Sequence, residues 1–375
     1  MRPIQNGITD AEVVFTNPQL NQWVAPMNGN SRIRKREGTN QNAGGCRLAV
    51  DSAGHKLDHI IFQGGEDVAV SEGKHVIDVT NGYLYGNMML GRMGLEADEG
   101  FCDNVADYGT LSTYAVNTTD IKLLYYWRAL YTGINRANLL LRSIDNPDVS
   151  ISQLERNHVK GQALFLRGYF YFLLVNKFGG VPLLLTPSQS SSNDAMQQPR
   201  ATTKEIYVQV LSDMEQAAGL VKDIRSVESA GRVNKSAVYG VLARVCLYMA
   251  GYPLKDVTKY ADAASWAKKV IDLNYHKLAS SYRQVFINYA QDLYNAEESI
   301  LEVEFYGNGT GVYNTTGGAV GIVSGIRYFN TAGSYGYSSG FVRPTQWLYD
   351  LYETGDLRRD WAIPPYRYVG EVITN

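Results

Sequence analysis

The sequence of 375 residues has few of the residues and patterns that mark a metal site, a redox pair or a membrane span. Cys46, Cys102 and Cys246 form no C-x-x-C pair, which argues against a zinc knuckle or a thioredoxin-type centre. The five histidines are scattered and no H-E-x-x-H motif occurs, so we expect no metal site and no cofactor. No apolar run approaches the roughly 18 to 20 residues that cross a bilayer. The segment MRPIQNGITD at the start has no apolar signal core.

Charge is also sparse and balanced. A formal net charge of -2 arises from 35 basic and 37 acidic residues, which gives no reason to expect the clustered positive surface that nucleic acid binds. Hydrophobic residues make up 45% of the chain, enough to bury a full core. We therefore expect a globular protein that does not bind nucleic acid.

The most informative segment runs from Lys160 to Leu184, KGQALFLRGYFYFLLVNKFGGVPLL. Its apolar residues recur at three- and four-residue spacing, and aromatic residues fill the other sides, which predicts a helix buried on most sides. Gly179, Gly180 and Pro182 close it. A glycine inside a helix costs about 1 kcal/mol relative to alanine. We therefore interpret Gly168 as a point where a neighbouring helix approaches closely.

Neighbouring segments predict stacked helical hairpins. Asp120 is a predicted N-cap, and Thr202 with Glu205 forms a predicted capping box. Asn234 caps a further helix, whose partner spans residues 260–272. The predicted buried face of the first helix carries Leu124, Trp127, Tyr131, Ile134, Asn138 and Leu141. The residues that permit close crossing in the second hairpin are Gly240, Ala243, Ala263 and Ala267. The predicted fold class is mainly α, with tetratricopeptide-like hairpins, loop-rich binding-side insertions and minor β structure.

The last part of the chain predicts a strand, long loops and one helix. Between Ser299 and Phe305 apolar residues alternate with Glu302 and Glu304, which predicts a strand with one solvated face. Residues 306–341 are rich in Gly, Tyr, Asn, Thr and Ser, which predicts surface loops of the kind that are often functional. A final helix is expected from Pro344 to Glu353, and the side chain of Trp347 is expected to be buried where this helix packs on the protein.

We expect one domain over residues 1–375. The first part, residues 1–119, is rich in loops and contains a predicted helix from Asp10 to Val24. The second, residues 120–298, is the helical-repeat scaffold. The third, residues 299–375, is a loop-rich binding-side segment that includes the final helix and is expected to be incomplete.

Several segments, in order, resemble the SusD/RagB family. The run R-G-Y-F-Y-F-L-L-V-x-x-F-G-G-V-P-L from Arg167 is similar to the family's signature helix and turn. Further matches are Leu124–Asn138, Ala237–Met249, the segment from Ser299 to Phe305, which resembles the family's strand before the binding-side loops, and the segment from Phe341 to Arg358. The resemblance implies an outer-membrane, surface-exposed nutrient-binding lipoprotein of Bacteroidetes. Because Cys46 follows two glycines and not an apolar leader, we expect the chain to lack the signal peptide and lipid anchor. Family members usually continue further beyond the position of Arg359, so we also expect part of the C-terminal segment to be missing.

The resemblance further implies a non-catalytic function: binding an oligosaccharide at the cell surface and delivering it to a SusC-like TonB-dependent outer-membrane transporter. The 27 tyrosines, against 11 phenylalanines and 5 tryptophans, fit this function. A tyrosine ring offers an apolar face and a hydroxyl group to a sugar or a peptide. The candidate ligand-binding residues are Asp98, Asp103, Tyr108, Tyr114, Tyr306, Tyr313 and Tyr337.

Other functions remain open at this point. A RagB-like relative would capture peptides instead of sugars. A helical glycoside hydrolase would need a pair of carboxylates, for which Asp98, Glu99 and Asp103 are candidates, as are Glu302 and Glu304. A helical-repeat adaptor would bind neither ligand class. Since the acids show no convincing catalytic arrangement, we expect that the protein is not an enzyme.

Overall fold

The computed structural model describes residues 84–85, 98–103, 115–188, 197–227, 229–291, 293–303, 325–329, 337–370 and 372–374. Within these residues the protein is mainly α-helical, which confirms the predicted fold class. The predicted helix from Asp10 to Val24 lies outside them, as do Tyr108, Tyr114, Tyr306 and Tyr313. No described helix is both long and apolar enough to cross a membrane.

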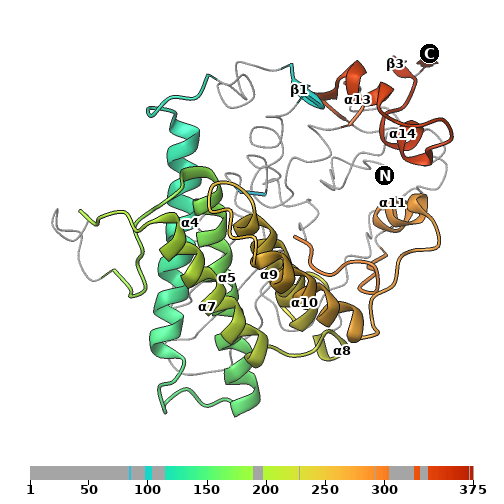
Figure 1. Cartoon of the computed structure of the whole chain (residues 1–375). Coiled ribbons are helices and arrows are strands. Elements are labelled where there is room, and N and C mark those ends of the chain that lie inside the picture. Colours follow the sequence, from blue (N-terminus) through green and yellow to red (C-terminus); the bar gives the residue numbers. More distant parts are fainter. Residues whose placement is uncertain are drawn as a thin grey trace.

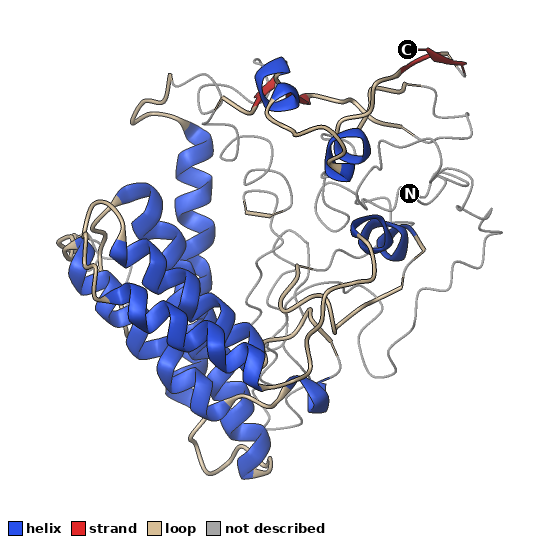
Figure 2. Cartoon of the chain, turned by 45° about the vertical axis from the view of Figure 1, so that its right-hand side comes forward, coloured by secondary structure: helices blue, strands red, loops and turns tan. Residues whose placement is uncertain are grey.

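A stack of long helices forms the scaffold (Figure 1). These helices are α4 (Ile121–Ser143), α5 (Gln153–Phe178), α7 (Thr203–Leu220), α9 (Lys235–Ala250) and α10 (Lys259–Asp272). Each packs on the next along the chain, and the short α8 (Ile224–Val227) lies in the connection between α7 and α9. Figure 2 shows the helices side by side in a second view. The arrangement is that of the predicted stacked hairpins.

Helix α5 is the centre of the core. Every residue from Gly161 to Val175 is buried, as the aromatic-rich sequence predicted. A Cβ atom added to Gly168 would lie 3.2 Å from Cγ of Met214 and 3.3 Å from Cβ of Asp213. Helix α7 therefore approaches α5 closely at Gly168, which confirms the interpretation of this glycine.

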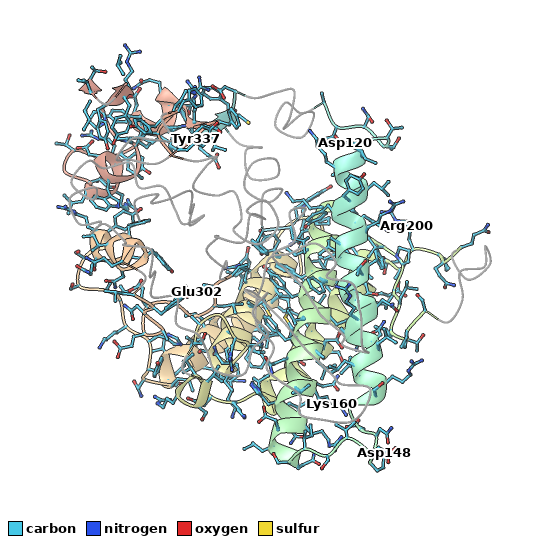
Figure 3. All side chains as sticks on the ribbon, turned by 180° about the vertical axis from the view of Figure 1, so that it is seen from behind. Asp120, Asp148, Lys160, Arg200, Glu302 and Tyr337 are labelled. Carbon is cyan, nitrogen blue, oxygen red and sulfur yellow. The ribbon has the colours of Figure 1, made fainter. Side chains whose placement is uncertain are left out.

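The helix starts follow local sequence signals. Asp120 accepts a hydrogen bond from the Lys122 amide and begins α4 (Figure 3). The side chains and amides of Thr202 and Glu205 bond reciprocally at the start of α7. Asn234 accepts from the amide of Ala237 at the start of α9. The predicted caps are therefore confirmed, because each depends only on residues close together in the chain.

The buried face of α4 is turned from the predicted one. Leu124 is 40% exposed, and Trp127 and Tyr131 are only partly buried. The buried residues are Tyr126, Leu130, Gly133, Ile134, Ala137, Asn138 and Leu140. The prediction was wrong at Leu124, and Tyr126 is buried instead. Apolar and aromatic residues follow one another here, so spacing alone did not show which of them face α5.

The expected close crossing of α9 and α10 is only partly right. Ala263 is buried, but Ala267 is exposed. A Cβ added to Gly240 would have Ile300 as its neighbour, at 3.4 Å, and not a residue of α10. Cys246 is 1% exposed, and burial raises the pKa of its thiol to about 11, so it packs in the core as a small apolar residue.

The predicted strand after Ser299 is not present in residues 299–303. The amide of Glu302 donates to the carbonyl of Ala230, and its carboxylate accepts from the hydroxyls of Tyr289 and Ser299. Leu301 and Val303 pack against the helical core. Glu302 therefore does not lie on a solvated strand face, because the main chain here bonds to a loop and not to another strand.

The C-terminal elements lie apart from the helical stack (Figure 2). They are α11 (Tyr282–Ala290), α13 (Gln346–Asp350), α14 (Leu357–Ala362), β3 (Arg367–Val369) and β4 (Val372–Thr374). Pro344 belongs to a strand, and the predicted final helix is the short α13, followed by α14. The prediction that Trp347 is a core residue was wrong, since its exposed fraction is 56%. A helix of little more than one turn does not enclose it.

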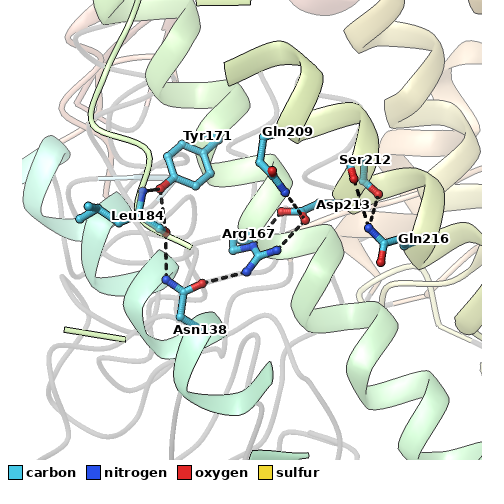
Figure 4. A network of polar contacts seen from close by, with 8 residues as sticks. All are labelled: Asn138, Arg167, Tyr171, Leu184, Gln209, Ser212, Asp213 and Gln216. Carbon is cyan, nitrogen blue, oxygen red and sulfur yellow. Dashed lines mark hydrogen bonds and ion pairs between the residues drawn. The ribbon is translucent and has the colours of Figure 1, made fainter. Parts of the chain in front are cut away.

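A buried ion pair joins α5 to α7 (Figure 4). Arg167 donates from Nε to Oδ2 of Asp213 at 2.8 Å and from Nη2 to Oδ1 at 2.6 Å. Asp213 is 0% exposed and Arg167 8% exposed. Gln209 donates to Asp213, and Arg167 Nη1 donates to Asn138 of α4 at 3.0 Å. Such two-pronged geometry is what makes a buried charge pair tolerable.

The same network holds the segment 181–188 against the helices. Asn138 donates to the carbonyls of Leu184 and Thr186. The hydroxyl of Tyr171 accepts from the Leu184 amide at 2.7 Å and donates to its carbonyl at 3.0 Å. Burial raises the pKa of Tyr171 to about 12, so the hydroxyl stays protonated as a donor. Three helices and a connecting segment thus share one polar network.

We predict that Asp213→Asn lowers the free energy of unfolding by about 3 to 5 kcal/mol, because it leaves the Arg167 charge buried without a counter-charge. Urea unfolding would measure the change. The control is Asp272→Asn in the exposed pair Lys268–Asp272, which should cost less than about 1 kcal/mol. Similar losses for the two variants would contradict the prediction.

Candidate functional site

Three segments far apart in the sequence meet in a small β-ribbon. Strand β1 (Gly100–Cys102) pairs antiparallel with β2 (Val342–Pro344), so that Phe101 lies opposite Arg343. Tyr328 and Ser338 exchange two main-chain hydrogen bonds of 2.8 Å. The chain at 337–344 therefore runs between residues 98–103 and residues 325–329.

The pleat of the ribbon sorts its side chains between two faces. Cys102 is 5% exposed, whereas its neighbour Phe101 is 45% exposed. Asp103 lies two residues after Phe101, and Arg343 lies opposite Phe101, so all three share the outer face. Tyr328 is 5% exposed and packs edge-on against Tyr368, with ring centroids 5.1 Å apart. The ribbon thus has a packed side and a solvated side.

Two arginines meet one carboxylate oxygen on the solvated side. Oδ2 of Asp103 lies 2.8 Å from Nη2 of Arg327 and 2.5 Å from Nη2 of Arg343. The carbonyls of Ser339 and Gly340 accept from the Nε atoms of Arg327 and Arg343 respectively. Each guanidinium group is therefore held by a charged and a neutral acceptor.

Aromatic rings flank these charges. The ring centroids of Phe329 and Tyr337 lie 5.7 Å apart, and Phe329 is 58% exposed. The guanidinium carbon of Arg327 lies 5.6 Å from the Phe329 centroid. We call the set Phe101, Asp103, Arg327, Phe329, Tyr337 and Arg343 the ribbon site. Figure 3 shows Tyr337 far from Lys160, at the other end of the molecule from the base of the helices.

The ribbon site brings together two of the predicted ligand-binding residues, Asp103 and Tyr337. Asp98 lies at the opposite end of β1, with an exposed side chain, and its carbonyl accepts from the Thr345 hydroxyl at 2.7 Å. Tyr108, Tyr114, Tyr306 and Tyr313 lie outside the described residues. The role of all seven in binding stays a prediction.

Four members of the ribbon site were not selected from the sequence: Phe101, Arg327, Phe329 and Arg343. Two weak signals were available. Phe101 lies between Asp98 and Asp103, and Arg343 falls in one of the segments that carry the family resemblance. No local pattern connects Arg327 to Asp103, since 224 positions separate them. Among the described residues no group of three or more His, Cys, Asp or Glu is placed to hold a metal ion.

Comparison with known proteins agrees with the architecture. A family model described as "SusD-like: Starch-binding associating with outer membrane" matches residues 96–247. SusD-like protein P38 of Formosa agariphila is 27% identical over 186 residues, which are 48% of this chain and 34% of that protein.

Among solved structures, a SusD homolog from Bacteroides thetaiotaomicron is 26% identical, with a TM-score of 0.66 over 78% of this chain and 56% of that one. A laminarin-binding SusD-like protein is also 26% identical, with a TM-score of 0.58 over 70% of this chain and 57% of that one. The helical fold and these matches together support the resemblance of the chain to the SusD/RagB family. The chain spans 56% and 57% of the lengths of the two solved relatives and 34% of the length of the curated one.

We predict that Gly340→Ala disrupts the ribbon site. Gly340 has φ +57°, and an added Cβ would lie 2.8 Å from the Arg327 amide nitrogen and 2.9 Å from the Gly325 carbonyl oxygen. Because both are main-chain atoms, residues 325–329 must move away. Hydrogen exchange at the Tyr328 and Ser338 amides should become faster.

The matched control is Gly370→Ala. Gly370 has φ +62° but no atom within 4 Å of an added Cβ, so it tests backbone strain without a collision. The exchange of the Tyr328 amide should not change in this variant. If it does, or if Gly340→Ala leaves the amide protected, the proposed collision is not what shapes the site.

Proposed function

We propose that the protein is a non-catalytic glycan-binding protein and that the ribbon site contacts the glycan. The observation that carries the proposal is the juxtaposition of exposed aromatic rings with fixed polar groups on one face. Phe101 and Phe329 are 45% and 58% exposed, although aromatic rings of this size are usually buried. Sugar rings offer C–H faces to such rings and hydroxyl groups to charged side chains.

The relatives support this proposal. One solved relative is described as laminarin-binding, and the matching family model is described as starch-binding. These descriptions concern the relatives, and the fold shared with them makes glycan binding the best-supported function here. We further propose that the protein acts at the cell surface of the outer membrane and delivers its ligand to a SusC-like TonB-dependent transporter.

The positions of the acids argue for binding without catalysis. Glycoside hydrolysis uses two carboxyl groups about 5 to 9.5 Å apart, one of them free to exchange protons. Asp103 is engaged by two guanidinium groups, and Asp98 lies beyond the other end of β1. Glu302, from the other candidate pair, accepts hydrogen bonds from Tyr289 and Ser299 at the scaffold.

We predict that Phe329→Ala and Tyr337→Ala each weaken glycan binding roughly 5- to 30-fold, the usual effect of removing a contact aromatic worth about 1 to 2 kcal/mol. Affinity electrophoresis in gels that contain laminarin, starch, xyloglucan or pectin would measure the change. The control is Tyr260→Ala, because Tyr260 is 55% exposed on α10. Retardation of the wild type by none of the glycans, or equal loss in the control, would count against the ribbon site.

We also predict no release of reducing ends when the protein is incubated with the same polysaccharides. The reason is the lack of a suitable carboxylate pair at the ribbon site. A reducing-sugar assay over a day would detect slow turnover. Turnover that Asp98→Asn or Glu302→Gln abolishes would overturn the non-catalytic proposal, whereas turnover that persists in both variants would indicate a contaminating enzyme.

A further inference from the structure

The arginines of the ribbon site have more hydrogen-bonding capacity than the protein uses. Each uses Nε for a main-chain carbonyl and Nη2 for the same oxygen of Asp103. Within the described part of the chain no partner is present for the Nη1 groups of Arg327 and Arg343. A guanidinium group carries five N–H donors in a planar fork, so both residues retain donors for a further acceptor.

The exposure of the three charged groups is unequal. The side chains of Arg327 and Arg343 are 43% and 41% exposed, whereas that of Asp103 is 25% exposed. The two positively charged groups are therefore more exposed to solvent than the negatively charged group that they share. Glu99 shares this face of the ribbon, but no ion pair joins it to either arginine. The cluster of three has a surplus of one positive charge, in a chain whose formal net charge is -2.

We infer that the ribbon site selects acidic oligosaccharides, in which a carboxylate or sulfate on the sugar ring binds Arg327 and Arg343 while the ring lies against Phe329 and Tyr337. This inference rests on the proposed function and narrows it to a class of glycan. A neutral sugar would place only hydroxyl groups against two guanidinium groups. An anionic group forms shorter and stronger charge-assisted hydrogen bonds with them.

The fixed geometry adds to this selectivity. The carbonyls of Ser339 and Gly340 and the Asp103 carboxylate hold the guanidinium groups in place, so little side-chain freedom is lost when a ligand binds. The ring of Phe329 lies 5.6 Å from the Arg327 guanidinium carbon. A sugar that stacks on Phe329 therefore brings its substituents within reach of Arg327.

The test compares tetragalacturonate with its fully methyl-esterified form, which is the same sugar without charge, by isothermal titration calorimetry. The acid should bind at least about tenfold more tightly, as expected for hydrogen bonds to a charged group. Raising the salt concentration should reduce the difference, because added salt screens the attraction between exposed charges. A sulfated carrageenan tetrasaccharide, run in parallel, shows whether sulfate serves as well as carboxylate.

Two variants with opposite expected effects separate ligand contact from a structural role. Arg343→Gln should weaken binding of the acid about tenfold and leave binding of the ester unchanged. Asp103→Asn removes the competing negative charge and should strengthen binding of the acid. If the cluster served only to tie the ribbon together, both variants would weaken binding of both sugars. The charge-matched control is Arg358→Gln, outside the ribbon site, where Arg358 pairs with Asp356.

The outcomes distinguish this inference from the proposed function. Equal affinity for the acid and the ester overturns the selectivity while glycan binding stands. Weakening of both sugars by Asp103→Asn also overturns it. Binding of neither sugar, together with no retardation by any polysaccharide, rejects the proposed function itself.

Discussion

The bidentate pair between Arg167 and Asp213 fixes how the scaffold is assembled. It lies where α4, α5 and α7 meet, and Asn138 extends it to the 181–188 segment. A slip of one residue between α5 and α7 would leave a guanidinium or a carboxylate buried alone, at a cost of about 3 to 5 kcal/mol. Aromatic packing alone tolerates such slips more easily, because apolar side chains of similar size substitute for one another. The pair thus gives a register to a core that is otherwise mostly apolar.

The sequence predicted what depends on near neighbours in the chain. The capping residues Asp120, Thr202 and Asn234 act within three residues of themselves, and Gly168 stands out because a helix interior does not favour glycine. Where the prediction failed, the pattern had more than one structural solution. The alternation around Glu302 suits a strand, but it equally suits an extended segment that packs Leu301 and Val303 on the helices. Arg167 was the neglected signal, since a charge within an apolar helix requires a buried partner.

The ribbon site was less accessible to prediction than the scaffold. Its residues come from three segments, and only pairing between β1 and β2 places Phe101 beside Arg343. Asp103 and Tyr337 were selected for their chemistry, but nothing local could show that they lie in one cluster. The arginines were missed because an exposed arginine in a loop has no periodic context. The resemblance to the SusD/RagB family therefore follows from the helices, whereas the proposed ligand choice depends on contacts between distant parts of the chain.

The separation of 224 positions between Asp103 and Arg327 has a consequence for synthesis on the ribosome. Helices α4, α5 and α7 are complete once residue 220 has been made, and their contacts are short in sequence, so the scaffold can form while translation continues. The two-strand pairing must wait until Pro344 has left the exit tunnel. A nascent chain therefore acquires its helical scaffold early, and the ribbon site only later, once Pro344 has been made.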